Sequence, residues 1–234
     1  MKKIVSCLFV AVAALTQPMM AHADLTFNAS VISEYRYRGV SQTHWQPAVQ
    51  AGADFSNGGL YLGAWASTIR WIKDSGGDAP LEFDFYGGYK GELSSGLGYD
   101  LGVLRYQYPS AGLSISPNST EVYGGVSMGV FSAKYFRSTT NLFGFDNSRG
   151  SGYLDLSATL DLGDGMTLMP HIGRQIVRNN GTYSYTDYAL TLTKDVHGVL
   201  LSATWLGTDS HAYTAPDGRN LGKGRLVVGT KINF

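Results

Sequence analysis

The sequence predicts an all-β protein, namely a single transmembrane antiparallel β-barrel of about 12 strands over residues 24–234. Three observations favour this fold. An export signal occupies the first 23 residues, short segments of alternating apolar and polar residues recur from Leu25 to Phe234, and the connections between these segments alternate between short and long. No later stretch approaches the roughly 20 apolar residues that a spanning helix needs, so strands must do any membrane spanning.

The first 23 residues have the features of a cleaved signal peptide. Lys2 and Lys3 give a positive start, residues 4–15 are apolar, and Ala21-His22-Ala23 offers a cleavage site of the small-x-small type. We therefore expect an exported chain that begins at Asp24 and resides in the outer membrane of a Gram-negative bacterium.

The composition of the mature chain excludes several kinds of site. Cys7 is the only cysteine and lies in the signal segment, so no thiol remains for a disulfide, a metal or nucleophilic catalysis. Without Lys2 and Lys3 there are 16 basic and 18 acidic residues, a balance that gives no electrostatic basis for binding nucleic acid. Glycine is abundant, at 30 of 234 residues, which suits many strands joined by tight turns.

Alternation of apolar and polar residues defines the predicted strands, because successive strand side chains point to opposite faces of a sheet. Residues 81–86, 153–162 and 226–234 are the clearest examples. The predicted strands are 25–38, 47–55, 60–71, 81–90, 97–108, 120–128, 131–140, 151–162, 166–178, 185–194, 199–207 and 223–234.

The connections fall into two classes. Every second one is a short turn, at 56–59, 91–96, 129–130, 163–165 and 195–198, and most of the others are longer and polar. Short periplasmic turns, longer extracellular loops and periplasmic termini are typical of outer-membrane barrels with an even strand number. A soluble β-sandwich would also alternate, but its turns need not sort by length.

Aromatic residues support the barrel. Tyrosine and tryptophan near predicted strand ends are expected to form interfacial girdles, with Tyr35, Tyr37, Trp71, Tyr106 and Tyr108 at the outer ends and Tyr61 and Tyr99 at the inner ends. The chain ends on Phe234 in an alternating segment, which resembles the signal that outer-membrane barrels present to the barrel-insertion machinery. That machinery and outer-membrane lipids are therefore the expected partners.

Several islands of sequence resemble the TorF family of porins, also known as Gcw_chp. They are residues 33–42, 46–52, 82–89, 99–100, 108–109, 121–123 and 184–188. The resemblance implies an outer-membrane pore, and it implies neither catalytic residues nor a particular solute.

A polar face on each strand indicates a wet lumen, because arginine or lysine in mid-membrane on the lipid face costs about 2–4 kcal/mol. We expect a channel for passive diffusion of small solutes through a lumen of mixed charge. The residues expected to line the lumen or its mouth are Glu34, Arg36, Arg38, Arg70, Glu82, Asp84, Asp100, Arg105, Glu121, Asp155, Arg174 and Asp187.

The charges also follow strand direction, which predicts a belt of ion pairs at the extracellular mouth. Arginines lie near the outer ends of upward strands and carboxylates near the outer beginnings of downward strands. The expected pairs are Arg70 with Glu82 or Asp84, Arg105 with Glu121, Arg137 with Asp155, and Arg174 with Asp187. Arg105 and Arg137 have the wrong parity for the lumen unless a bulge shifts them.

Two other functions stay open at this point. A closed barrel could carry the same charges purely to satisfy one another, without transport. An outer-membrane enzyme would need histidine, serine and a carboxylate at one place, whereas His44, His171, His197 and His211 lie in no recognisable motif. No cofactor, metal site or catalytic residue is expected, because no cluster has ligand spacing.

Overall fold

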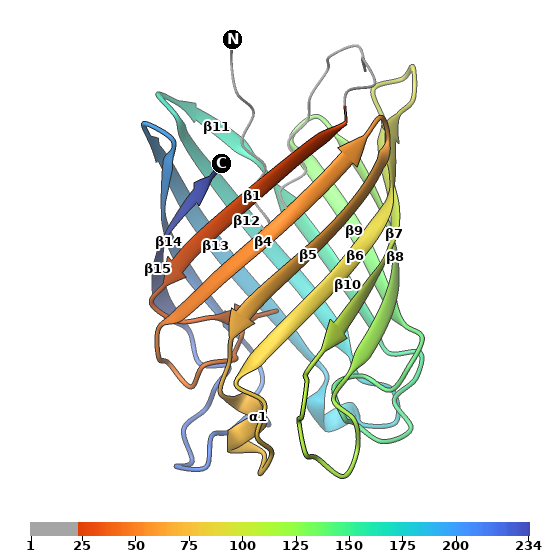
Figure 1. Ribbon diagram of the computed structural model, residues 1–234, viewed down its shortest axis with the longest axis vertical. Coiled ribbons are helices and arrows are strands. Elements are labelled where there is room, and N and C mark those ends of the chain that lie inside the picture. Colours follow the sequence, from red (N-terminus) through yellow and green to blue (C-terminus); the bar gives the residue numbers. More distant parts are fainter. Residues whose placement is uncertain (1–22) are drawn as a thin grey trace.

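In the computed structural model, which describes residues 23–234, the chain forms a closed antiparallel barrel with tilted strands (Figure 1). The barrel closes because β1 (Asp24–Ile32) pairs with β15 (Arg225–Asn233). β10 (Gly152–Ala158) pairs with both β9 (Phe131–Ser138) and β12 (Met166–Ile176). β11 (Leu160–Gly163) continues β10 after Thr159, so the two form one interrupted strand and the barrel has 12 strands. The predicted fold class is therefore confirmed.

The strand boundaries follow the alternation pattern. The other wall strands are β4 (Ala48–Asn57), β5 (Leu60–Thr68), β6 (Leu81–Glu92), β7 (Gly98–Gln107), β8 (Ser119–Met128), β9 (Phe131–Ser138), β12 (Met166–Ile176), β13 (Tyr185–Val196) and β14 (Val199–Thr208). Short helices α1 (Trp71–Asp74) and η1 (Gly181–Tyr183) lie in connections. Among residues 23–234, no helix has the length and apolar character needed to cross a membrane. The predicted signal peptide lies almost entirely outside the described residues.

The first predicted strand, 25–38, is wrong at its end. β1 stops at Ile32, and the chain then leaves the wall and turns into the barrel. Residues 36–37 and 40–41 form a separate two-stranded hairpin, β2 (Arg36–Tyr37) and β3 (Val40–Ser41). The alternation of apolar and polar residues continues through this region, so the pattern alone does not show where the chain leaves the barrel wall.

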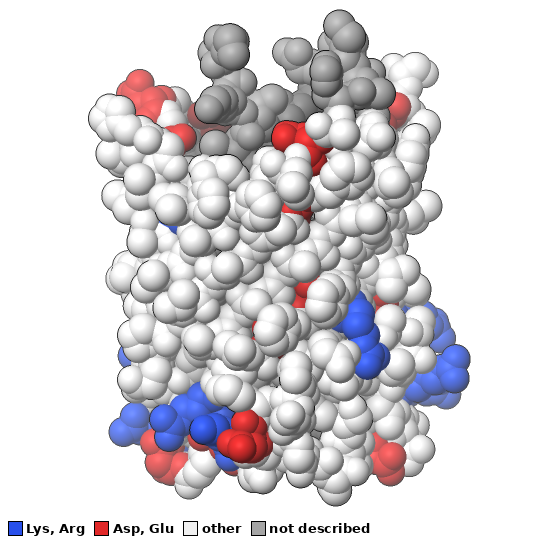
Figure 2. Space-filling view, viewed as in Figure 1, with Lys and Arg blue, Asp and Glu red and all other residues white. Residues whose placement is uncertain are grey.

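The outer face of the wall is apolar and the inner face is polar. Exposed large side chains project outward from every wall strand, including Val31, Phe85, Val103, Leu154, Leu190 and Trp205. Their strand neighbours, such as Ser30, Asp84 and Thr191, have the opposite parity and face the interior. Figure 2 shows a mid-barrel surface with few charges and basic side chains concentrated toward the lower end.

The two ends of the barrel differ. The upper end in Figure 1, called the turn end here, carries the tight connections that follow β4, β6, β8, β11 and β13. The lower end, called the loop end, carries residues 33–47, 69–80, 108–118, 139–151, 177–184 and 209–224. The predicted alternation of short and long connections is present, with the long ones gathered at one end.

The C-terminal residue is built into the closing seam. Phe234 exchanges backbone hydrogen bonds with Phe27 of β1, at 2.8 and 2.9 Å, and the two rings stack with centroids 6.1 Å apart. Phe234 nevertheless remains 72% exposed on the outer side.

Replacing Phe234 with lysine should reduce assembly in the outer membrane, because the exposed terminal aromatic would be lost and a charge placed on the seam. We expect the chain to accumulate in the periplasm, as measured by fractionation and by the heat-modifiable band on gels. Phe234→Tyr is the matched control and should assemble normally. Wild-type amounts of membrane-embedded barrel in Phe234→Lys would refute the insertion-signal role.

Candidate functional site

Residues 33–47, called the inward segment here, cross the interior near the loop end. Their side chains contact inner-face residues on strands from opposite sides of the barrel, including Glu82 on β6, Glu121 on β8 and Gln175 on β12. Tyr35, Arg36 and Arg38 are buried in these contacts. The inward segment therefore spans the interior of the barrel near its loop end.

The hairpin at the centre of the inward segment has a two-residue turn, Arg38-Gly39. Both residues have positive φ, 46° and 81°, as the tight turn of a twisted hairpin requires. A methyl group at Gly39 would lie 2.7 Å from Cγ2 of Thr208 and 2.9 Å from Cβ of Asp187. Glycine is needed here both for the backbone conformation and because the tip packs directly against β13 and β14.

Arg38 is the main link between the inward segment and the wall. Its guanidinium donates to both carboxylate oxygens of Glu121, at 3.0 and 2.6 Å, and to Oε1 of Gln175 at 2.8 Å. It also lies 4.0 Å from the ring centroid of Tyr153. Burial lowers the pKa of Arg38, but Glu121, Tyr37 and Tyr106 together outweigh burial and raise this pKa well above its usual value. Arg38 therefore stays charged across the physiological pH range.

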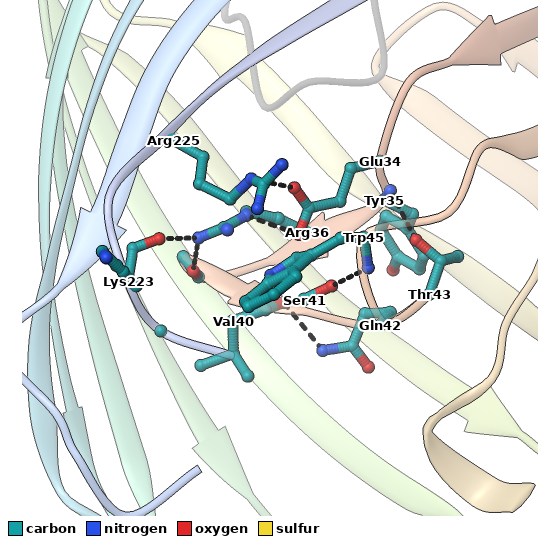
Figure 3. A network of polar contacts seen from close by, with 12 residues as sticks. Glu34, Tyr35, Arg36, Val40, Ser41, Gln42, Thr43, Trp45, Lys223 and Arg225 are labelled. Carbon is teal, nitrogen blue, oxygen red and sulfur yellow. Dashed lines mark hydrogen bonds and ion pairs between the residues drawn. The ribbon is translucent and has the colours of Figure 1, made fainter. Parts of the chain in front are cut away.

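A second polar network holds the beginning of the inward segment (Figure 3). Glu34 accepts a hydrogen bond from Nε of Arg36 at 2.9 Å and lies 3.6 Å from Nε of Arg225. Nη1 of Arg36 donates to the carbonyl oxygens of Gly39 and Lys223, each at 2.9 Å. The Glu34 carboxylate thus links Arg36 of the hairpin to Arg225 at the start of β15.

Tyrosine hydroxyls also attach the inward segment to the wall. Tyr35 donates to Glu82 at 2.8 Å, and the hydroxyls of Tyr37 and Tyr106 lie 2.6 Å apart. Tyr106 in turn donates to Glu121 at 3.1 Å. The predicted aromatic girdle is wrong for Tyr35, Tyr106 and Tyr108, which are buried inside the barrel, and for Tyr37 and Tyr61, whose hydroxyls contact interior residues.

Two further clusters lie on the inner wall. Lys134 pairs with Asp100 at 2.5 Å, and Tyr61 donates to the same carboxylate. His171 lies 3.2 Å from Asp155 and 3.6 Å from Asp187, which also accepts a hydrogen bond from Tyr153. His171 therefore faces the interior, and Arg174, which has the opposite parity on β12, faces outward. Among residues 23–234, no group of three or more potential ligands is arranged to hold a metal ion.

The predicted lining residues divide into two groups. The interior contains Glu34, Arg36, Arg38, Glu82, Asp84, Asp100, Glu121, Asp155 and Asp187. Arg70, Arg105 and Arg174 do not line it. Arg70 follows β5 and is exposed, while Arg105 and Arg174 share the outward parity of Val103 and Ile172.

The predicted belt of ion pairs is wrong. Arg70 pairs with Asp74, whereas Arg105 and Arg174 donate to Thr120 and Thr186 on neighbouring strands. Arg137 lies opposite Gly152, and Asp155 pairs with His171 instead. Arg105, Arg137 and Arg174 are one residue out of phase with the inward carboxylates, so they lie on the opposite face of the wall.

Sequence reasoning missed the roles of Tyr35, Tyr37, Gln175 and His171. A signal existed in residues 33–45, where Gly39 follows four residues of alternating tyrosine and arginine and a polar run begins at Ser41. An Arg-Gly pair is compatible with a tight hairpin turn, which would have ended the strand at Tyr37.

The comparisons with known proteins agree with this architecture. Residues 17–234 match the sequence profile of a family described as "Bacterial protein of unknown function (Gcw_chp)". The chain belongs to the Gcw_chp family. Membership confirms the family resemblance seen in the sequence. No curated protein sequence is similar enough to count as a relative of this Gcw_chp chain.

Two solved porins share the fold of this Gcw_chp chain. The first is the KdgM porin in complex with disordered oligogalacturonate, with 9% identity and a TM-score of 0.55 over 91% of this chain and 99% of that one. The second is the NanC porin, with 13% identity and a TM-score of 0.57 over 89% and 99% of the two chains. At these identities the likeness establishes the barrel fold.

Proposed function

We propose that this protein is an outer-membrane channel for passive diffusion of small solutes. The observation that carries the proposal is a closed 12-stranded barrel with an apolar outer face and a polar, mixed-charge inner face. Such a wall satisfies all backbone hydrogen bonds within a bilayer and offers water a polar path. The two porins of similar fold support a channel over an enzyme.

The inward segment sets the narrowest region of the proposed channel. Arg36 and Arg38 pair there with Glu34 and Glu121, and Glu82 bonds to Tyr35, so charges of both signs line this region. We expect only modest preference between cations and anions. The solute would be small and polar, because the wall around this region supplies hydroxyl, amide and ionic groups rather than an apolar pocket.

A closed structural barrel is the second candidate function. It is favoured by the near-complete burial of Arg38 and Glu121, whose side chains are 5% and 1% exposed. An enzyme has less support. The arrangement considered for one needs a serine beside the histidine, whereas the interior His171 contacts Asp155, Asp187 and Tyr153 among the described residues.

Single-channel recording in planar bilayers with the purified full chain separates the two candidates. A channel should give discrete current steps whose reversal potential shows weak selectivity. A heat-modifiable, inserted barrel that carries no current would refute the channel and support the closed barrel. Heat-denatured protein from the same preparation is the control for contaminating porins.

The orientation proposed for the barrel places the turn end and both termini in the periplasm, with the loop end outside. A tag inserted after Gly218 should be accessible to antibody on intact cells, because Gly218 is an exposed turn residue of the loop 209–224. The neighbouring Ala215 is 5% exposed and packs against Val40 and Tyr185, so it is a poor insertion site. A tag at Asp164, in the tight turn between β11 and β12, should need permeabilised cells. The opposite labelling pattern would invert the topology.

A further inference from the structure

The geometry points to a binding site for a phosphate-bearing lipid headgroup on the outside of the barrel, at the loop end between β9, β10 and β12. The site is an open pocket of about 620 Å³ whose charged lining consists of Arg137, Arg149 and Arg178. The rest of its lining is neutral, namely Ser138, Thr139, Asn141, Asn147, Gly150 and Asn179. The inference rests on the proposed membrane location and adds a ligand that the channel proposal does not contain.

Like charges converge in this pocket. A methyl group at Gly150 would lie 3.2 Å from Nη1 of Arg178 and 3.6 Å from Nη2 of Arg137, so both guanidinium groups approach the same point. Among residues 23–234, none of the three pocket arginines forms an ion pair with a carboxylate. Most other arginines at this end, including Arg38, Arg70 and Arg219, do form one. An anionic ligand would remove the repulsion and supply the missing acceptors.

The pocket is held in shape by hydrogen bonds between its two loops. Nδ2 of Asn179 donates to the carbonyl of Asn147 at 2.8 Å, and Nδ2 of Asn180 donates to the carbonyl of Asp146 at 2.9 Å. Nη1 of Arg178 donates to the carbonyl of Arg149 at 3.3 Å, which fixes one guanidinium beside the other loop. Guanidinium forks match phosphate oxygens in geometry as well as charge, so phosphate is the expected anion.

The surroundings indicate that the phosphate belongs to a lipid. Arg137 is one residue from the end of β9 and shares its outward parity with Tyr135, which is 48% exposed. Leu154 lies opposite Tyr135, and Ile176 lies opposite Gly152 on the next strand, both exposed on the outer face. A headgroup in the pocket would therefore place its acyl chains along the apolar wall. A soluble phosphate ester would leave this surface uncovered.

The test uses the full barrel purified in detergent and native mass spectrometry with lipid A carrying two phosphates. We expect binding to weaken about tenfold for each of Arg137→Gln and Arg178→Gln, because each loses one charge-assisted hydrogen bond to phosphate. Arg70→Gln is the matched control, since it removes the same charge from a residue already paired with Asp74. It should bind as wild type. Every variant is first checked for the heat-modifiable folded form.

Three results would overturn the assignment. Equal weakening in Arg70→Gln would show a general charge effect, and equal binding of dephosphorylated lipid A would show that phosphate is not recognised. Glucose 1-phosphate that binds as tightly as lipid A would assign the pocket to a soluble solute. Single-channel current is recorded on the same variants. A barrel without current that still binds lipid A through Arg137 and Arg178 refutes the channel alone.

Discussion

Replacing Arg38 with methionine is expected to destabilise the folded barrel by about 3–5 kcal/mol, because Glu121 would keep a buried charge without its partner. Glu121 is completely buried, and Arg38 donates to both of its carboxylate oxygens. Gln175 would also lose the donor to its side-chain oxygen. The free energy of unfolding can be measured by tryptophan fluorescence in detergent micelles with increasing guanidinium.

A double-mutant cycle separates the ion pair from packing. Arg38→Met combined with Glu121→Met should recover much of the lost stability, since apolar residues of similar volume often replace a buried ion pair at little cost. Glu121→Met alone completes the cycle and should cost about as much as Arg38→Met, because Arg38 would then keep the buried charge without its partner. Additive losses in the double variant would show that Arg38 and Glu121 act independently and that the inward segment is held by other contacts.

Removal of the inward segment should raise single-channel conductance severalfold or convert a silent barrel into a conducting one. Residues 34–44 can be replaced by a four-residue Gly/Ser linker, because the ends of β1 and β4 are already paired, with Ile32 opposite Ala48. The variant loses the side chains of Tyr35, Arg36 and Arg38 from the cross-section. The measurement is current in planar bilayers at fixed voltage and salt.

The control for this deletion is wild type with the same linker inserted after Gly218, which alters an exposed loop and leaves the interior intact. Its conductance should match wild type. A deletion variant that folds, inserts and shows unchanged conductance would place the constriction elsewhere, for example at the Asp100–Lys134 pair on the inner wall. Reversal potentials should also move toward cation selectivity, because the deletion removes two arginines and one glutamate.

The period-2 pattern by itself predicted the fold. A strand in a barrel wall has an apolar environment on its outer face and a polar one on its inner face. Alternation in segments such as 81–86 therefore indicates both that the segment is a strand and which side chains face inward. Glu82, Asp84, Glu121 and Asp187 lie inside as that parity requires. The same rule argued against an inward position for Arg105 and Arg137, and both face outward. Parity is a local property, which is why one sequence was enough to read it.

The contents of the lumen depended on the tertiary structure. Residues 33–38 alternate as well as any wall strand, yet they leave the wall because their tyrosines and arginines find partners across the barrel. Arg38 and Glu121 are separated by 83 positions, and Arg38 and Gln175 by 137. Such contacts exist only once 12 strands have closed and brought β8 and β12 to face the same interior. The sequence determined the wall and its two faces, whereas closure decided which charges meet inside it.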